Sequence, residues 1–150
     1  MFLEKEIQEL KSFLDKLDQK KAIVSSKTVG WHIDHALRTI YAIIKALQRS
    51  EPSLYKWRFN LGRVFILTFK FIPRGTAMAP ENVVSHSNVN KERILVLLDK
   101  VEASLSRLTE LHPCSHFVHA DAGTLKLDEA KKFTLIHTRH HIKIIKDILK

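Results

Sequence analysis

Two histidines near the end of the sequence have the spacing of a metal-binding pair. His137 and His141 are four residues apart, so on a helix their imidazoles share one face, a turn apart. Two such rings can hold one divalent cation, with each nitrogen about 2.0–2.1 Å from it if the ion is zinc. Both histidines continue an apolar stripe formed by Phe133, Ile144 and Ile148. We therefore expect the pair to face the interior of the protein.

The spacing of this pair is weak evidence by itself. The chain has nine histidines among 150 residues. With so many histidines, the number of i,i+4 pairs expected by chance is roughly 0.5, so such a motif needs structural context. His112 and His116 have the same spacing, which we attribute to chance. The alternative interpretation of His137 and His141 is a pair of hydrogen-bonded polar residues in a core, because buried imidazoles without partners are costly.

A third ligand must come from another helix, and the second predicted helix offers two histidines. On a helical wheel His32 lies close to the edge of the apolar stripe. His35 lies further round, on a flank formed by Thr39, Ala42 and Ala46, whose small side chains would let a neighbouring helix approach. Helical phase mildly favours His32, and both residues remain candidates.

Three histidines from two helices would leave one coordination position for water or substrate. Open positions are typical of catalytic rather than structural metal sites. Metal-bound water can lose a proton near neutral pH and become a nucleophile. Alternatively, the ion can bind a thiol as its thiolate and activate it for transfer.

Other polar residues near these histidines have weaker claims to a role. His32 or His140 could carry a proton beside the ion, because an imidazole titrates near neutrality, or could only surround the site. Asp34 points away from the apolar stripe and is expected to be a solvated or capping acid. Arg74 is a candidate contact for an anionic substrate, with simple solvation as the alternative.

Four long amphipathic segments would position these residues. In each of them apolar side chains recur every three or four residues, which predicts a helix with one buried face. The four segments are 3–20, 28–50, 89–111 and 128–149.

The segments between these helices differ in length and character. A shorter aromatic helix is expected over 60–72, and loops over 73–80 and 112–127. Ser26 or Thr28 is expected to cap the second helix, and Asp128 the last. Five aromatic residues are expected to pack at the edge of the core: Trp57, Phe59, Phe65, Phe69 and Phe71.

The composition favours one all-α domain over residues 1–150. Four glycines and four prolines are few for a sheet-rich fold, which needs many tight turns. The single cysteine, Cys114, cannot form an internal disulfide and is not expected to be a nucleophile. The helical pattern therefore predicts a four-helix bundle.

Charge and hydropathy narrow the choice of partners and compartment. The net charge of +9 favours acidic partners, but the basic residues are spread along the chain, so no specific nucleic-acid binding is expected. The most apolar stretch, 61–72, is about half as long as a membrane span needs. The N-terminus lacks an apolar signal segment, so we expect a cytoplasmic protein.

Four stretches resemble the DinB-like superfamily, close to its bacterial members. They are 29–37, 72–80, 119–125 and 136–141, and their order and spacing fit the family over essentially the whole chain. The resemblance implies a four-helix bundle, often dimeric, with a short extra helix and a long connection between helices 2 and 3. In the third stretch, Ala120 and Ala122 stand where relatives tend to have a proline and an aromatic residue.

The resemblance also implies a ligand set and a class of chemistry. Many members bind zinc or nickel through one histidine of the second helix and two histidines of an HxxxH motif on the last. Carried over, these are His35, which follows Trp31 by one turn, and His137 and His141, with His32 kept as a substitute.

Members with assigned activities include thiol-dependent transferases and isomerases. The leading hypothesis is therefore a divalent-metal protein, a thiol transferase or hydrolase with a small-molecule or thiol substrate, forming a homodimer. The second is a non-catalytic bundle that dimerises or binds a partner, and the third is a nucleic-acid binder that uses the basic charge.

Overall fold

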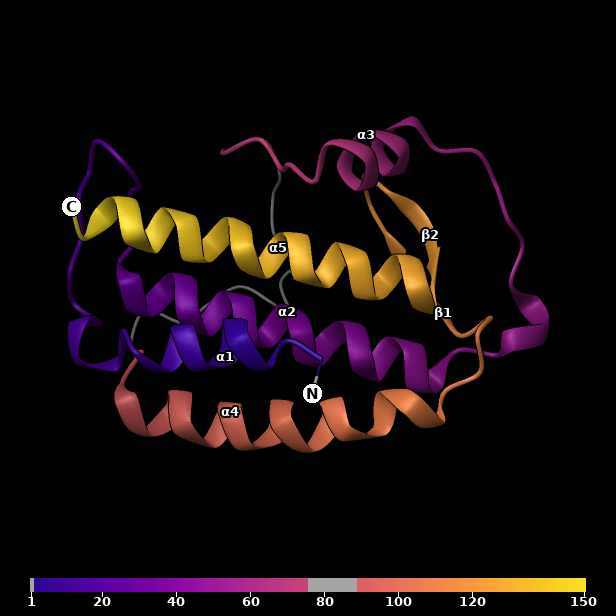
Figure 1. The fold of residues 1–150 in the computed structure, drawn as a ribbon, viewed down its shortest axis with the longest axis horizontal. Coiled ribbons are helices and arrows are strands. Elements are labelled where there is room, and N and C mark those ends of the chain that lie inside the picture. Colours follow the sequence, from indigo (N-terminus) through magenta and orange to yellow (C-terminus); the bar gives the residue numbers. More distant parts are fainter. Residues whose placement is uncertain (1, 76–88) are drawn as a thin grey trace.

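The computed structural model describes residues 2–75 and 89–150. Within these ranges the protein is mainly helical, with a small two-stranded sheet (Figure 1). The helices are α1 Glu4–Lys11, α2 Val29–Arg49, α3 Leu61–Phe69, α4 Lys91–Leu105 and α5 Leu127–Ile148, and the strands are β1 His116–His119 and β2 Gly123–Lys126.

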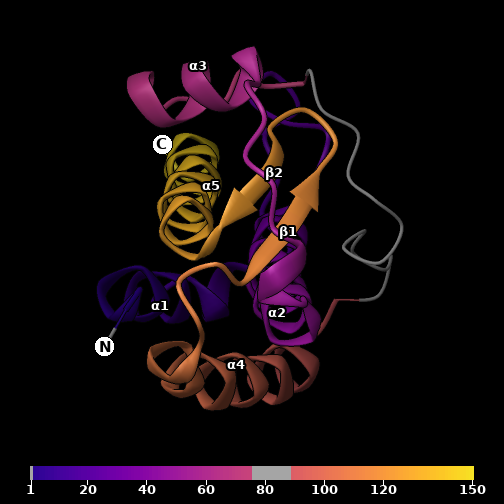
Figure 2. The same ribbon diagram turned by 90° about the vertical axis from the view of Figure 1, so that its right-hand side faces the viewer.

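The two longest helices, α2 and α5, form the centre of the molecule. They lie side by side along the long axis in Figure 1 and pack against each other over their length. In Figure 2, which looks almost along both helices, α4 lies on one side of this pair and α3 with the strand pair on the other. Helix α1 packs on α5, and α4 packs on α2. The histidines of α2 and α5 therefore lie in the middle of the fold.

Helix α2 forms where the apolar pattern predicts it. Thr28 caps its first turn, because the threonine hydroxyl accepts a hydrogen bond from the backbone N–H of Trp31 at 3.2 Å. This result selects Thr28 over Ser26 as the cap. A run of apolar side chains at helical spacing is almost completely buried: Ile33, Leu37, Ile40, Ile44 and Leu47.

The expectation of an all-α fold was wrong in one region. Residues 112–127, predicted as a loop, include the antiparallel hairpin of β1 and β2, in which His116 pairs with Lys126 and His119 with Gly123. Phe117 and Leu125 face the core from opposite strands. Gly123 adopts a φ of 65°, which glycine tolerates without strain. Each strand has only four residues, too few for an alternating pattern to stand out in the sequence.

The predicted cap of the last helix was also wrong. Helix α5 begins at Leu127, so Asp128 already lies in its first turn. The hairpin leads directly into the helix through Lys126, whose backbone N–H donates to the Glu129 carboxylate at 3.1 Å. Asp128 and Glu129 place negative charge at the positive end of the helix dipole, which is favourable.

Helix lengths differ from the predicted ranges mainly at the ends. The first segment is α-helical only over α1 and continues as a 3₁₀ turn at Leu14–Lys16. Helix α4 likewise continues as a 3₁₀ helix, Ser106–Glu110. Of the loop predicted at 73–80, residues 76–80 lie outside the described residues.

The short extra helix exists as α3, but its aromatic residues do not fill the core edge as expected. Asn60 caps this helix by accepting from the backbone N–H of Arg63 at 2.7 Å. All five aromatic side chains of the region are at least 42% exposed: Trp57, Phe59, Phe65, Phe69 and Phe71.

None of the helices within residues 2–75 and 89–150 combines the length and the apolar composition that a membrane-spanning helix requires.

Candidate metal centre

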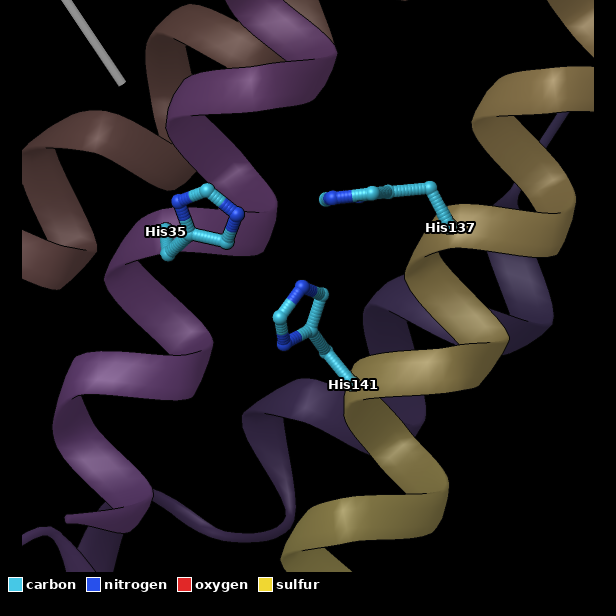
Figure 3. A group of neighbouring side chains, drawn as sticks. All are labelled: His35, His137 and His141. Carbon is cyan, nitrogen blue, oxygen red and sulfur yellow. The ribbon is translucent and has the colours of Figure 1, made fainter. Parts of the chain in front are cut away.

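Helices α2 and α5 bring three imidazoles together in the interior. His35 comes from α2 and His137 and His141 from α5, and one nitrogen from each ring lies within 4.8 Å of the others. Figure 3 shows the three side chains converging on the space between the two helices. Ligand atoms about 2.0–2.1 Å from one tetrahedral ion are about 3.4 Å apart, so small side-chain adjustments would allow all three to hold the same ion.

Sequence spacing and helix packing together explain this convergence. His137 and His141 project from one face of α5 because they are one turn apart, and their ring centroids are 4.6 Å apart. His35 faces them from α2, with its centroid 4.7 Å from that of His141 and 5.2 Å from that of His137. Within residues 2–75 and 89–150, no other group of three histidine, cysteine or carboxylate side chains has such spacing.

Burial keeps the imidazoles of His137 and His141 neutral. His35 and His141 are 5% and 7% exposed. Burial holds the pKa of His137 well below its usual 6.5, and the nearby His35 lowers it further. Burial also holds the pKa of His141 well below 6.5, and His137 lowers it further. Neutral imidazoles are the form that coordinates metal ions.

One buried nitrogen of the group has no partner among the described residues. His137 Nδ1 is inaccessible to solvent and makes no hydrogen bond there. An unsatisfied buried nitrogen is unfavourable, and coordination to a cation would relieve this cost. The donor set also suits such an ion, because imidazole is a common ligand of zinc and nickel. The residues present therefore fit a divalent transition metal.

Aromatic stacking fixes the ring of His35. The indole of Trp31 lies nearly parallel to it, with centroids 4.9 Å apart and planes inclined by 12°. In the sequence, Trp31 stands out only as a marker of the family resemblance, yet in the structure its contact orients a residue of the site. A tryptophan four residues before a histidine, on one face of a helix, is the sequence signal for this contact.

His32, the alternative helix-2 ligand, lies beside the group rather than within it. It is 4% exposed. Its Nδ1 is 3.0 Å from Nδ1 of His141, and its Nε2 is 2.9 Å from Oγ of Ser25. The proximity of the rings therefore favours His35, against the mild preference of helical phase.

The other sequence candidates have partners that the sequence did not reveal. His140 is half-buried beside His141, and burial with the charge of Arg74 lowers its pKa to about 4. Arg74 is not merely solvated, because it forms an ion pair with Asp147 at 2.6 Å. The expectation of a solvated Asp34 was wrong: it is 2% exposed and accepts from Arg38 Nε at 2.7 Å.

A cavity of about 1320 Å³ adjoins the three histidines. It lies between α2, α3, α5 and the hairpin, and its apolar walls include Phe65, Ile66 and Phe133. Ala42 and Ala46, the small residues that share a flank of α2 with His35, line this cavity. The volume is ample for a small organic molecule.

His119 is a cavity residue that the sequence analysis did not propose for the site. Its ring packs on Phe133 at 4.7 Å, and its Nδ1 accepts from the backbone N–H groups of Asp121 and Ala122. Burial lowers its pKa. The resemblance over 119–125 included this histidine but gave it no role.

Comparisons with known proteins add no relative. No family model matches the chain, and searches of the curated proteins and of the solved structures find no significant match.

Proposed function

We propose that this protein is a divalent-metal-binding member of the DinB-like superfamily, with zinc or nickel held by His35, His137 and His141. The observation that carries the proposal is the convergence of three imidazoles, with ligand atoms within 4.8 Å of one another, beside a large cavity. The family assignment rests on the sequence resemblance. A long His-bearing second helix and a last helix with an HxxxH pair are compatible with it.

We further propose a metal-dependent thiol transferase or hydrolase acting on a small molecule. Three protein ligands leave a coordination position for water or a substrate thiol, and a bound ion would stabilise the deprotonated form of either. The apolar walls of the cavity would hold the substrate body. His32 and His140 both line the cavity, but both ring nitrogens of His32 are already in contact with other side chains, so His140 is the better placed of the two proton-carrier candidates.

The test is metal content and thermal stability of the purified protein. After incubation with Zn²⁺ or Ni²⁺ and removal of the excess, the wild type should retain about one ion per chain, and His137→Ala and His141→Ala should retain almost none. A hundredfold excess of free ion over its Kd should stabilise the wild type by about 2.7 kcal/mol. His112→Ala is the matched control, because His112 is an exposed histidine far along the chain from the group. If the wild type retains no ion and gains no stability from added Zn²⁺ or Ni²⁺, the proposal is wrong.

A second candidate function is favoured by the surface of α3. Four of its apolar side chains, Leu61, Val64, Phe65 and Phe69, are exposed by 42–72%. We call these four side chains the α3 apolar face. Large exposed apolar surfaces are typical of protein–protein contacts. We propose self-association through this face as the alternative, in which the bundle dimerises without catalysis.

A further inference from the structure

His32 connects the three-histidine group to Ser25 through a chain of short contacts. Its Nδ1 is 3.0 Å from Nδ1 of His141, and its Nε2 is 2.9 Å from Oγ of Ser25. The serine oxygen also accepts from the backbone N–H of Lys27 at 3.1 Å. His32 is only 4% exposed, and its contact with His141 is buried, whereas its contact with Ser25 is part-buried.

The contact between two Nδ1 atoms restricts where the protons lie. A neutral imidazole carries one N–H, so one of the two rings must donate and the other accept. In the first arrangement, His141 Nδ1–H donates to His32 Nδ1, and His32 Nε2–H donates to Ser25 Oγ. In the second, the Ser25 hydroxyl donates to His32 Nε2, and His32 Nδ1–H donates to His141 Nδ1.

Only the first arrangement leaves His141 Nε2 with a lone pair that can bind a cation. There the proton of His141 is on Nδ1, and its Nε2 is bare. In the second arrangement, the proton of His141 is on Nε2, which removes its lone pair. Figure 3 shows one nitrogen of His141 facing His35 and His137 while the other points away from them. Since Nδ1 is in contact with His32, the nitrogen that faces the group is Nε2.

We infer that His32 is a positioning residue for the metal centre: by accepting from His141 Nδ1–H, it orients that ring and fixes the tautomer whose Nε2 can bind the ion. This inference rests on the proposed metal site. It gives His32 a role different from both earlier candidates, a substitute ligand and a proton carrier. Both of its ring nitrogens are already engaged, one with His141 and one with Ser25.

The geometry around His32 supports a fixed ring orientation. Trp31 meets its ring edge-on, with centroids 5.1 Å apart and planes inclined by 86°. A hydrogen-bond partner on the ring nitrogen that does not bind the ion commonly orients a metal-ligating histidine. Loss of such a partner typically weakens metal binding about 10–100-fold. His137 has no equivalent partner among the described residues, because its Nδ1 makes no hydrogen bond there. Of the two histidines in the HxxxH pair, it is therefore His141 that another histidine, His32, orients.

Two substitutions at one position separate positioning from simple packing. His32→Phe keeps an aromatic ring but removes the acceptor, and the Zn²⁺ affinity should fall about 10–100-fold. His32→Asn places a side-chain oxygen near the position of Nδ1, where it can accept from His141, and the loss should stay under about tenfold. His112→Phe and His112→Asn are the matched controls at an exposed histidine and should leave the affinity unchanged.

The measurement is a competition titration in which Zn²⁺ displaces Co²⁺, whose visible absorption reports the ligand field. If the wild type binds and His32→Phe binds equally well, the positioning role is wrong while the metal site stands. If the wild type binds neither ion, the proposed function fails and this inference with it. If His32→Phe weakens binding and His32→Asn restores none of it, loss of packing explains the effect, and the inference is also wrong.

A second measurement uses the wild type, so it does not depend on how any variant folds. Long-range ¹H–¹⁵N spectra of the histidine rings distinguish Nδ1–H from Nε2–H tautomers. With Zn²⁺ bound, His141 should carry its proton on Nδ1 and His32 on Nε2. If His32 carried its proton on Nδ1 in the zinc-loaded protein, the inference would be overturned.

Discussion

Burial holds His32, His137 and His141 neutral, and this has a consequence for stability. The pKa values of His137 and His141 lie well below 6.5, and that of His32 is lowered to about 4 by burial and by His35. In the unfolded chain these groups titrate near 6.5. Between about pH 6.5 and pH 4, the unfolded chain therefore binds protons that the native protein does not.

We accordingly predict that the metal-free protein loses stability as the pH falls through this window. The free energy of unfolding, measured with urea in the presence of a chelator, should decrease from about pH 6.5 towards pH 4. These histidines should contribute no slope above about pH 7.5, where both states are neutral. His112→Asn should show the same slope as the wild type. A stability that rises on acidification over this range would contradict the assignment of buried, neutral rings.

The relative effects of His35 and His32 substitutions test which of them binds the ion. His35→Ala removes one of three ligands and should cost more affinity than the about 10–100-fold expected for a residue that only orients a ligand. His32→Ala should fall within that smaller range. The Zn²⁺ affinities of both variants, measured under one buffer condition, decide the order. If His32→Ala were the more damaging change, the helix-2 ligand would be His32.

At the scale of elements, helix α3 contacts the hairpin so closely that one position must be glycine. A Cβ atom at Gly62 would clash with the backbone carbonyl oxygen of Asp121, which cannot move without shifting the hairpin turn. Arg63 adds to this junction, because its guanidinium donates to the carbonyl of Thr124 at 2.7 Å. Together these contacts hold α3 over the cavity.

We predict that Gly62→Ala destabilises the protein despite the better helix propensity of alanine. The clash should force α3 away from the hairpin, at about 1–3 kcal/mol in the free energy of unfolding. Leu61→Ala, at a neighbouring position that is 72% exposed, should change it by no more than about 0.5 kcal/mol. Equal effects of the two substitutions in urea unfolding would show that α3 is not docked on the hairpin in this way.

The sequence predicts the long elements well because their signal is repeated many times. Helices α2 and α5 carry five or more apolar positions at helical spacing, and both form where expected. The sequence did not predict the hairpin, because two strands of four residues each carry no repeated pattern. The burial of Asp34 was not predicted either, although Arg38, four residues later, is a sequence signal for their ion pair.

The candidate site was only partly predictable for a related reason. Spacing alone placed His137 and His141 on one face, but the choice between His32 and His35 depends on how α2 packs on α5. Helical phase describes one helix at a time and cannot give this relation. The family resemblance favoured His35, and the three-ring geometry agrees with that choice.

At the scale of the whole molecule, the α3 apolar face departs from an ordinary polar surface. Phe69 is 66% exposed and Leu61 is 72% exposed on it. If the protein is a homodimer through this face, Phe69→Glu should shift it towards the monomer, because a charge buried without a partner opposes association. Light scattering after gel filtration, over a hundredfold range of concentration, is the measurement.

The matched control for this prediction is Val96→Glu on α4, which changes an apolar side chain that is 55% exposed elsewhere on the surface. This variant should keep the oligomeric state of the wild type. A wild type that stays monomeric at every concentration would exclude self-association through the α3 apolar face, without affecting the metal centre.

The central claim is that three imidazoles from α2 and α5 bind one ion. X-ray absorption at the zinc edge of the Zn²⁺-loaded protein tests it most directly, because the spectrum reports the atoms bound to the metal. We predict a first shell at about 2.0–2.1 Å with the multiple-scattering pattern of about three imidazoles. His137→Ala should lose one of them if it still binds zinc. A wild-type spectrum of oxygen ligands without imidazole scattering would contradict the account.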